Sequence, residues 1–230
     1  MVVESVFEVR FAPRPPYGIL PGQLYDLIKA EFPEPEELAA AQVPIELDVA
    51  PLPRHRFRSA DGHRMVQTGI GLVSINCTQY TGYESFRADV ERVLEAALQL
   101  RLLTEIRRLG LRYINRAPLD RPWTDILTYT IKAPPIVEEP ATARRFAWRT
   151  ELEGKGVLQT VIAWPLADNV KGPAVVLDFD CFAEDGQVNS RNGILQWIDE
   201  SHERIYNAFR DSLTDDYFKS LGKVANAGIR

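Results

Sequence analysis

Two similar short stretches, Val66-Gln67-Thr68-Gly69-Ile70 and Leu158-Gln159-Thr160-Val161-Ile162, lead us to expect that one structural unit is used twice in the fold. Each copy continues through a β-rich run that ends near a cysteine, Cys77 in the first and Cys181 in the second. A long amphipathic segment with helical spacing follows each run. The period of roughly 90 residues is too long for a solenoid repeat, so the pattern favours one unit used twice.

We therefore expect an α+β fold made of two pseudo-symmetric β-rich halves, each a mainly antiparallel sheet backed by a long helix. The halves would comprise residues 1–120 and residues 121–230, packed as one compact domain. Short further strands are expected at residues 45–49 and 128–132.

The composition is that of an ordinary globular protein. The chain has 230 residues, of which 45% are hydrophobic, so it can bury a sizeable core. No segment approaches the ~20 apolar residues that span a bilayer, and the first residues lack the pattern of a signal peptide. The sequence therefore predicts a cytoplasmic protein without membrane contact. Two cysteines do not make a disulfide framework, so we expect free thiols.

The charge is distributed unevenly along the chain. Arginines concentrate in residues 54–64 and 101–121, whereas Asp and Glu dominate residues 178–216. The simplest interpretation is that the basic and acidic segments face each other; the alternative is that each is a binding surface. A net charge of −5 disfavours a nucleic-acid footprint over the whole chain.

A hairpin around Asp61-Gly62 places arginines on one face of a sheet. A two-residue turn at this pair would set Phe57 opposite Val66, and alternation then aligns the arginines of the first strand, Arg54, Arg56 and Arg58. Beside them lie Gly69 and Gly71, positions where another backbone or a flat ligand can approach closely. This face is either a solvated surface paired with acidic groups or a binding surface.

A later strand carries polar residues on both of its sides. Alternation sends Leu111, Tyr113 and Asn115 one way and Arg112, Ile114 and Arg116 the other. Burial alone does not explain this pattern, so the polar members, Arg112, Asn115 and Arg116, join the three hairpin arginines as candidate ligand- or partner-binding residues.

Three features of the chain together resemble one bacterial family. They are the run Gly110-Leu111-Arg112-Tyr113-Ile114-Asn115, the strand that holds Asp178 and Asp180, and the closing helix with His202. The family is sporadically distributed and consists of uncharacterised proteins of about 250 residues. The resemblance implies a bacterial, cytoplasmic product of an accessory gene, of the kind found in defence, toxin-antitoxin or mobile-element cassettes, and it transfers no catalytic residue.

Catalytic candidates are few. Asp178 and Asp180 lie two residues apart on a strand, which places their carboxylates roughly 6–7 Å apart. They would share a divalent cation if a third ligand arrived, but ion pairing with arginines is the simpler role. His202 is a candidate general base, although a histidine on an apolar helical stripe more often belongs to the core. The chain shows no phosphate-binding loop, dinucleotide fingerprint, nucleophile elbow or metal-ligand spacing, so no cofactor and no metal are expected.

We therefore expect a non-catalytic binding or assembly protein that acts through a sheet face or through the cleft between its halves. Its partner would be another protein or a second copy of the chain. One alternative is a metal-dependent phosphoesterase or nuclease that uses Asp178 and Asp180 with His202. Another is a protein that binds single-stranded nucleic acid through its arginines and aromatic residues.

Overall fold

The computed structural model describes residues 1–13, 17–38, 52–103, 105–128, 144–152, 156–166, 172–184, 186, 188 and 190–225. The strand expected at residues 45–49 lies outside these ranges, as does all but the first residue of the one expected at 128–132.

Nine strands of the described part form one antiparallel sheet in the order β2-β3-β4-β5-β1-β6-β9-β8-β7. The strands are β1 (Val2–Phe11), β2 (Glu34–Glu37), β3 (Pro53–Arg58), β4 (Arg64–Gly69), β5 (Leu72–Cys77), β6 (Ile106–Pro118), β7 (Arg144–Leu152), β8 (Gly156–Leu166) and β9 (Ala174–Glu184).

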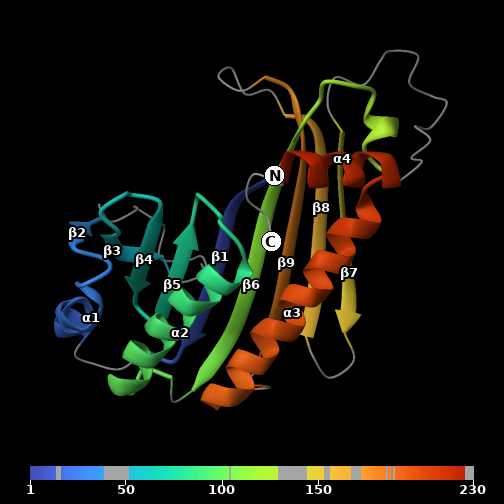
Figure 1. Ribbon diagram of the computed structural model, residues 1–230. Coiled ribbons are helices and arrows are strands. Elements are labelled where there is room, and N and C mark those ends of the chain that lie inside the picture. The colour runs from blue at the N-terminus through green and yellow to red at the C-terminus, as the bar shows by residue number, and fades with distance from the viewer. Residues whose placement is uncertain are drawn as a thin grey trace.

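Helices cover one face of this sheet. The described helices are α1 (Leu20–Ile28), α2 (Tyr83–Gln99), α3 (Arg191–Ser212) and α4 (Asp215–Ala225), with short 3-10 turns η1 (Tyr17–Ile19) and η2 (Trp123–Asp125). Figure 1 shows α2 and α3 crossing the same face, with α1 beside the β2 edge and α4 near one end of the strands. Along the chain, α2 follows the meander β3–β4–β5 and α3 follows the meander β7–β8–β9.

The α+β content is as expected, but the prediction of two pseudo-symmetric halves, each with its own sheet, is wrong. One continuous sheet runs through both parts of the chain. The reason is the N-terminal strand: β1 pairs with β5 along one edge and with β6 along the other. Strand β6 then pairs with β9 over eleven residue pairs. The backbone hydrogen bonds therefore continue from β2 to β7 without a free edge between them.

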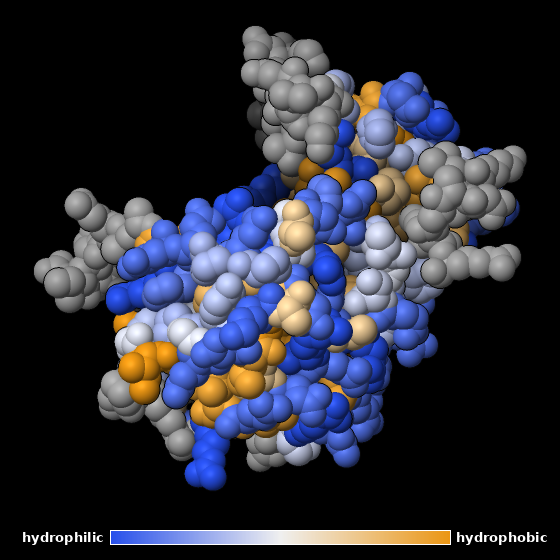
Figure 2. Space-filling model, turned by 60° about the vertical axis from the view of Figure 1, so that its left-hand side comes forward, coloured by the Kyte–Doolittle hydropathy of each residue, from blue (hydrophilic) through white to orange (hydrophobic). Residues whose placement is uncertain are grey.

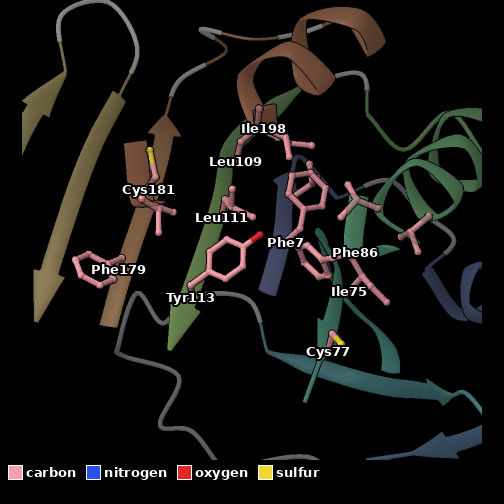
Figure 3. Packing of buried hydrophobic residues seen from close by; sticks show 14 of the residues in the cluster. Phe7, Ile75, Cys77, Phe86, Leu109, Leu111, Tyr113, Phe179, Cys181 and Ile198 are labelled. Atoms are coloured by element: carbon pink, nitrogen blue, oxygen red, sulfur yellow. The ribbon is translucent and has the colours of Figure 1, made fainter. Parts of the chain in front are cut away.

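The core lies between the sheet and the helices, because alternation turns one side of each central strand toward α2 and α3. Phe7 of β1, Leu111 of β6 and Phe179 of β9 are at most 1% exposed and belong to one apolar cluster (Figure 3). Burying each such side chain stabilises the fold by about 1.5–3 kcal/mol. Both cysteines are buried free thiols, as expected.

The predicted register of the β3–β4 hairpin is confirmed, since Phe57 pairs with Val66. The turn itself is not the predicted two-residue turn, which at Asp61-Gly62 would be of type I′ with a positive φ at both residues. Gly62 has φ +71°, but Asp61 does not have a positive φ, and the amide of Gly62 donates to the carbonyl of Ser59. The loop therefore spans four residues and keeps the same register. Another backbone does approach Gly71, whose carbonyl accepts from the amide of Phe11.

The face seen in Figure 2 is mainly hydrophilic, with several hydrophobic areas between charged side chains. Large apolar side chains are exposed at Ile19, Leu27, Leu52 and Ile70. Scattered apolar side chains of this kind are normal on a protein surface.

Candidate functional site

A pocket of about 460 Å³ lies between the helices and the two central strands β1 and β6 of the sheet. This volume falls within the range of roughly 300–1,000 Å³ that is typical of small-molecule sites. Strands β1 and β6, the β5–α2 loop and helices α2, α3 and α4 all contribute to its walls. The lining residues are Met1, Val2, Tyr80, Gly82, Tyr83, Tyr113, Asn115, His202, Ile205, Tyr206, Phe209, Phe218, Lys219 and Leu221.

One wall of the pocket is a fixed aromatic stack. The rings of Tyr83 and His202 lie parallel, with an interplanar angle of 1° and centroids 3.8 Å apart. The hydroxyl of Tyr83 donates to Asp199 of α3, and Arg87 of α2 donates to both oxygens of the same carboxylate at 2.6 and 3.1 Å. These bonds tie α2 to α3 and hold the Tyr83 ring against the imidazole.

The floor of the pocket is formed by Tyr113 of β6. Its ring makes edge contacts with Tyr80 and Phe86, at centroid distances of 5.5 and 6.1 Å. In Figure 3 the ring extends from β6 toward Phe86. The hydroxyl is buried and makes no well-aligned hydrogen bond with a described residue, although Tyr80 lies beside it. Burial raises the pKa of Tyr80 to about 12 and raises the pKa of Tyr113 well above its ordinary value, so both phenols remain protonated at neutral pH.

The electrostatics of the pocket are simple. Burial lowers the pKa of His202, and Asp199 only partly opposes this effect, so the imidazole is neutral at physiological pH. Its Nδ1 atom is buried without a hydrogen-bond partner among the described residues. Asn115 is buried, and its amide donates to the carbonyl of Leu177 at 3.4 Å. Lys219, exposed on α4, is the only described lining residue with a side-chain charge at neutral pH.

The structure brings Asn115 and His202 together in this pocket, but it separates Asn115 from Arg112 and Arg116. Because side chains alternate along β6, the two arginines project from the opposite face of the sheet. Arg112 donates to both oxygens of Asp178 at 2.6 and 2.8 Å, and Arg116 donates to the carbonyl of Gly172.

The two aspartates of β9 also lie on that opposite face. Asp178 pairs with Arg112, and Asp180 accepts from Arg108 at 2.9 Å. Burial raises the pKa of Asp180 in spite of the neighbouring arginines. The sheet separates both carboxylates from His202, and no group of three metal-ligating side chains occurs among the residues that the structure describes. The basic segment 101–121 and the acidic segment 178–216 therefore pair through β6 and β9, as expected, whereas Asp199 of the acidic segment pairs with Arg87, which lies outside both basic segments.

The hairpin arginines lie far along the sheet from the pocket, on β3. Arg56 and Arg58 both pair with Glu36 of β2, at 3.5 and 2.6 Å, and Arg54 is exposed. The amide oxygen of Gln67 accepts from Arg56 at 3.2 Å once its orientation is assigned from the hydrogen-bond pattern. Two of the three arginines are thus engaged with groups of their own sheet, which favours the solvated-surface interpretation.

Sequence reasoning missed most of the pocket. Tyr80, Tyr83 and Lys219 were not among the candidate residues. For Tyr113, the alternation along its strand predicted only which way the side chain points. Their common signal is weak: Tyr80 and Tyr83 bracket the junction of β5 and α2, where aromatic side chains with a polar end often line a partly wet site.

No protein-family model and no curated protein matches the chain. In the described part of the chain, every helix is too short or too polar to cross a membrane.

Proposed function

We propose that the protein is a non-catalytic binding protein whose ligand is a small, largely apolar aromatic molecule held in the pocket between α2 and α3. The observation that carries the proposal is the lining itself. Aromatic rings come from four different elements, and the Tyr83–His202 stack is fixed in advance by Asp199 and Arg87. Aromatic pairs prefer offset or edge-on contacts, which such walls provide to a flat ligand.

Binding is favoured over catalysis because of what the described lining contains. It includes neither a carboxylate nor a serine, threonine or cysteine that could act as a nucleophile. Among the described lining side chains, His202 is the one whose ordinary pKa is near neutral, and the Asp178–Asp180 pair lies across the sheet. An isolated imidazole without a partner on the substrate side orients a ligand more readily than it transforms one.

A binding protein without a reaction exerts its effect through a partner. The expectation of another protein, or of a second copy of the chain, therefore belongs to the same proposal. So does the expectation of a role in a bacterial accessory system, which rests on the family resemblance alone.

The proposal is tested with 2-naphthylmethanol, a neutral two-ring probe, by isothermal titration calorimetry. Ligand efficiencies of small ligands imply a dissociation constant of about 0.1–1 mM for a probe of this size. Phe209→Ala removes a ring from the pocket wall and should weaken binding about fivefold or more. Phe146→Ala removes an equally half-buried ring from β7, outside the pocket, and should leave the affinity unchanged.

Two results would contradict the proposal. One is the absence of binding to the wild-type protein at concentrations near the solubility limit of the probe. The other is an equal affinity in the Phe209→Ala and Phe146→Ala variants, since this would place the probe elsewhere on the protein.

A further inference from the structure

Among the described lining residues of the pocket, a single side chain is cationic. Lys219 is exposed on α4, where its neighbours Phe218 and Leu221 are half-buried in the wall. Asp215, four residues before Lys219 on α4, is paired with another residue: it accepts from Arg210 at the end of α3 at 2.6 Å. Lys219 itself forms no ion pair with any residue in the described ranges, whereas Lys29 of α1 pairs with Asp26 at 2.8 Å.

The rest of the lining adds no opposing charge. His202 is neutral at physiological pH, and Asn115 and the tyrosine hydroxyls are uncharged. The α-amino group of Met1 also lies in the lining, but burial lowers its pKa and so favours its neutral form. A ligand in the pocket therefore meets apolar rings around its body and, among the lining side chains, one ammonium group at the solvent-exposed end of the lining, that of Lys219. A charged group on the ligand is stabilised only at that end, because burying it among the rings would remove its hydration without compensation.

We propose that the ligand is an aromatic monocarboxylate, with its ring system between the Tyr83–His202 stack and Phe209 and its carboxylate at the ammonium group of Lys219. This inference rests on the proposed function, because it specifies the ligand of the same pocket. One ammonium group neutralises one carboxylate. A phosphate or a dicarboxylate would bring a second negative charge without a second cationic side chain in the described lining, to a protein whose net charge is already −5.

The test compares two probes that share one ring system, 2-naphthoate and 2-naphthylmethanol, by calorimetry at neutral pH. At low salt the carboxylate should bind about fivefold more tightly, the gain of one partly exposed ion pair. This preference should shrink at high salt, because mobile ions screen the pair.

Three variants isolate the role of the ammonium group. Lys219→Gln should abolish the preference for the carboxylate, so that the two probes bind this variant with the same affinity. Lys219→Arg should retain the preference, and Lys29→Gln, at a paired lysine on α1, should have no effect. Because Lys219 is exposed, all three variants should keep the wild-type melting temperature.

The outcomes separate the two proposals. If the alcohol binds but the carboxylate has no advantage, or if the advantage survives in Lys219→Gln, the inference about the charge is wrong and the aromatic site stands. If neither probe binds, the proposed function fails and the inference fails with it.

Discussion

Replacing Asp199 with alanine removes the link between the two long helices and the wall of the pocket. The carboxylate accepts from the hydroxyl of Tyr83 and from two nitrogens of Arg87. Hydrogen bonds to charged groups contribute about 1.5–3 kcal/mol each when they are buried. The Asp199 side chain is 45% exposed, so each bond is worth less, and we expect a total loss of about 2 kcal/mol in the free energy of unfolding.

The assay is urea denaturation at neutral pH together with a thermal melt. For a chain of this length, 2 kcal/mol corresponds to a fall in melting temperature of about 4–8 °C. The variant should also bind 2-naphthylmethanol more weakly, because the Tyr83 ring is no longer held against His202.

The pH dependence provides a second check. The guanidinium of Arg87 is the main cause that lowers the pKa of Asp199 in the folded protein, so the folded value lies below the unfolded value of about 3.9. Such a group stabilises the fold fully above its unfolded pKa and loses this contribution as the pH falls through the folded pKa. The stability gap between wild type and Asp199→Ala should therefore be full at neutral pH and close under acid conditions, below about pH 4.

A double-mutant cycle with Arg87→Ala should give a coupling energy of about 1 kcal/mol or more. Asp199→Asn, which keeps the shape but not the charge, should lie between wild type and Asp199→Ala. The reasoning would be refuted if Asp199→Ala were as stable as wild type at neutral pH, or if the gap did not change with pH.

Three further expectations concern the backbone, the floor of the pocket and the open face of the sheet. Gly62→Ala should cost about 1 kcal/mol, because only the positive φ opposes it, whereas Gly156→Ala should cost at least about 3 kcal/mol, because its Cβ would lie 2.1 Å from a carbonyl oxygen of β9. Tyr113→Phe should leave the stability unchanged or raise it by up to about 1 kcal/mol, because it deletes a buried hydroxyl that lacks a well-aligned partner. Mg²⁺ and Mn²⁺ should not raise the melting temperature, because Asp178 and Asp180 are engaged with arginines.

Urea denaturation decides the first two of these expectations. Equal losses at Gly62 and Gly156 would contradict the close approach to β9, and a loss of more than about 1 kcal/mol in Tyr113→Phe would show that this hydroxyl is well bonded. For the third, the contrary result is a metal-induced rise in melting temperature that disappears when both aspartates are changed to asparagine.

The faces of the strands could be predicted from the sequence, but the strand order could not. Alternation placed Leu111 and Tyr113 of β6 on one side and Arg112 on the other, and in the structure the first two are buried whereas Arg112 is exposed. The pairing of β1 with both β5 and β6 was not predicted, because the backbone groups that form these pairs are the same in every residue. A side-chain pattern therefore shows which face of a strand is buried and not which strand lies at its edge.

The pocket could be predicted only in part for the same physical reason. Asn115 and His202 were candidates because each is a polar residue in an apolar pattern. The remaining walls are aromatic and aliphatic residues that, one at a time, have the pattern of ordinary core positions. Their convergence depends on how α2, α3 and α4 lie over β6, which is set by tertiary packing.

The most direct test of the account is a crystal structure of the protein soaked with 2-naphthoate well above its dissociation constant. The account predicts the ring system between the Tyr83–His202 stack and Phe209, with the carboxylate within hydrogen-bond distance, about 3 Å, of Lys219 Nζ. An empty pocket, or a probe bound outside it, would contradict the central claim that this space between α2 and α3 is the ligand site.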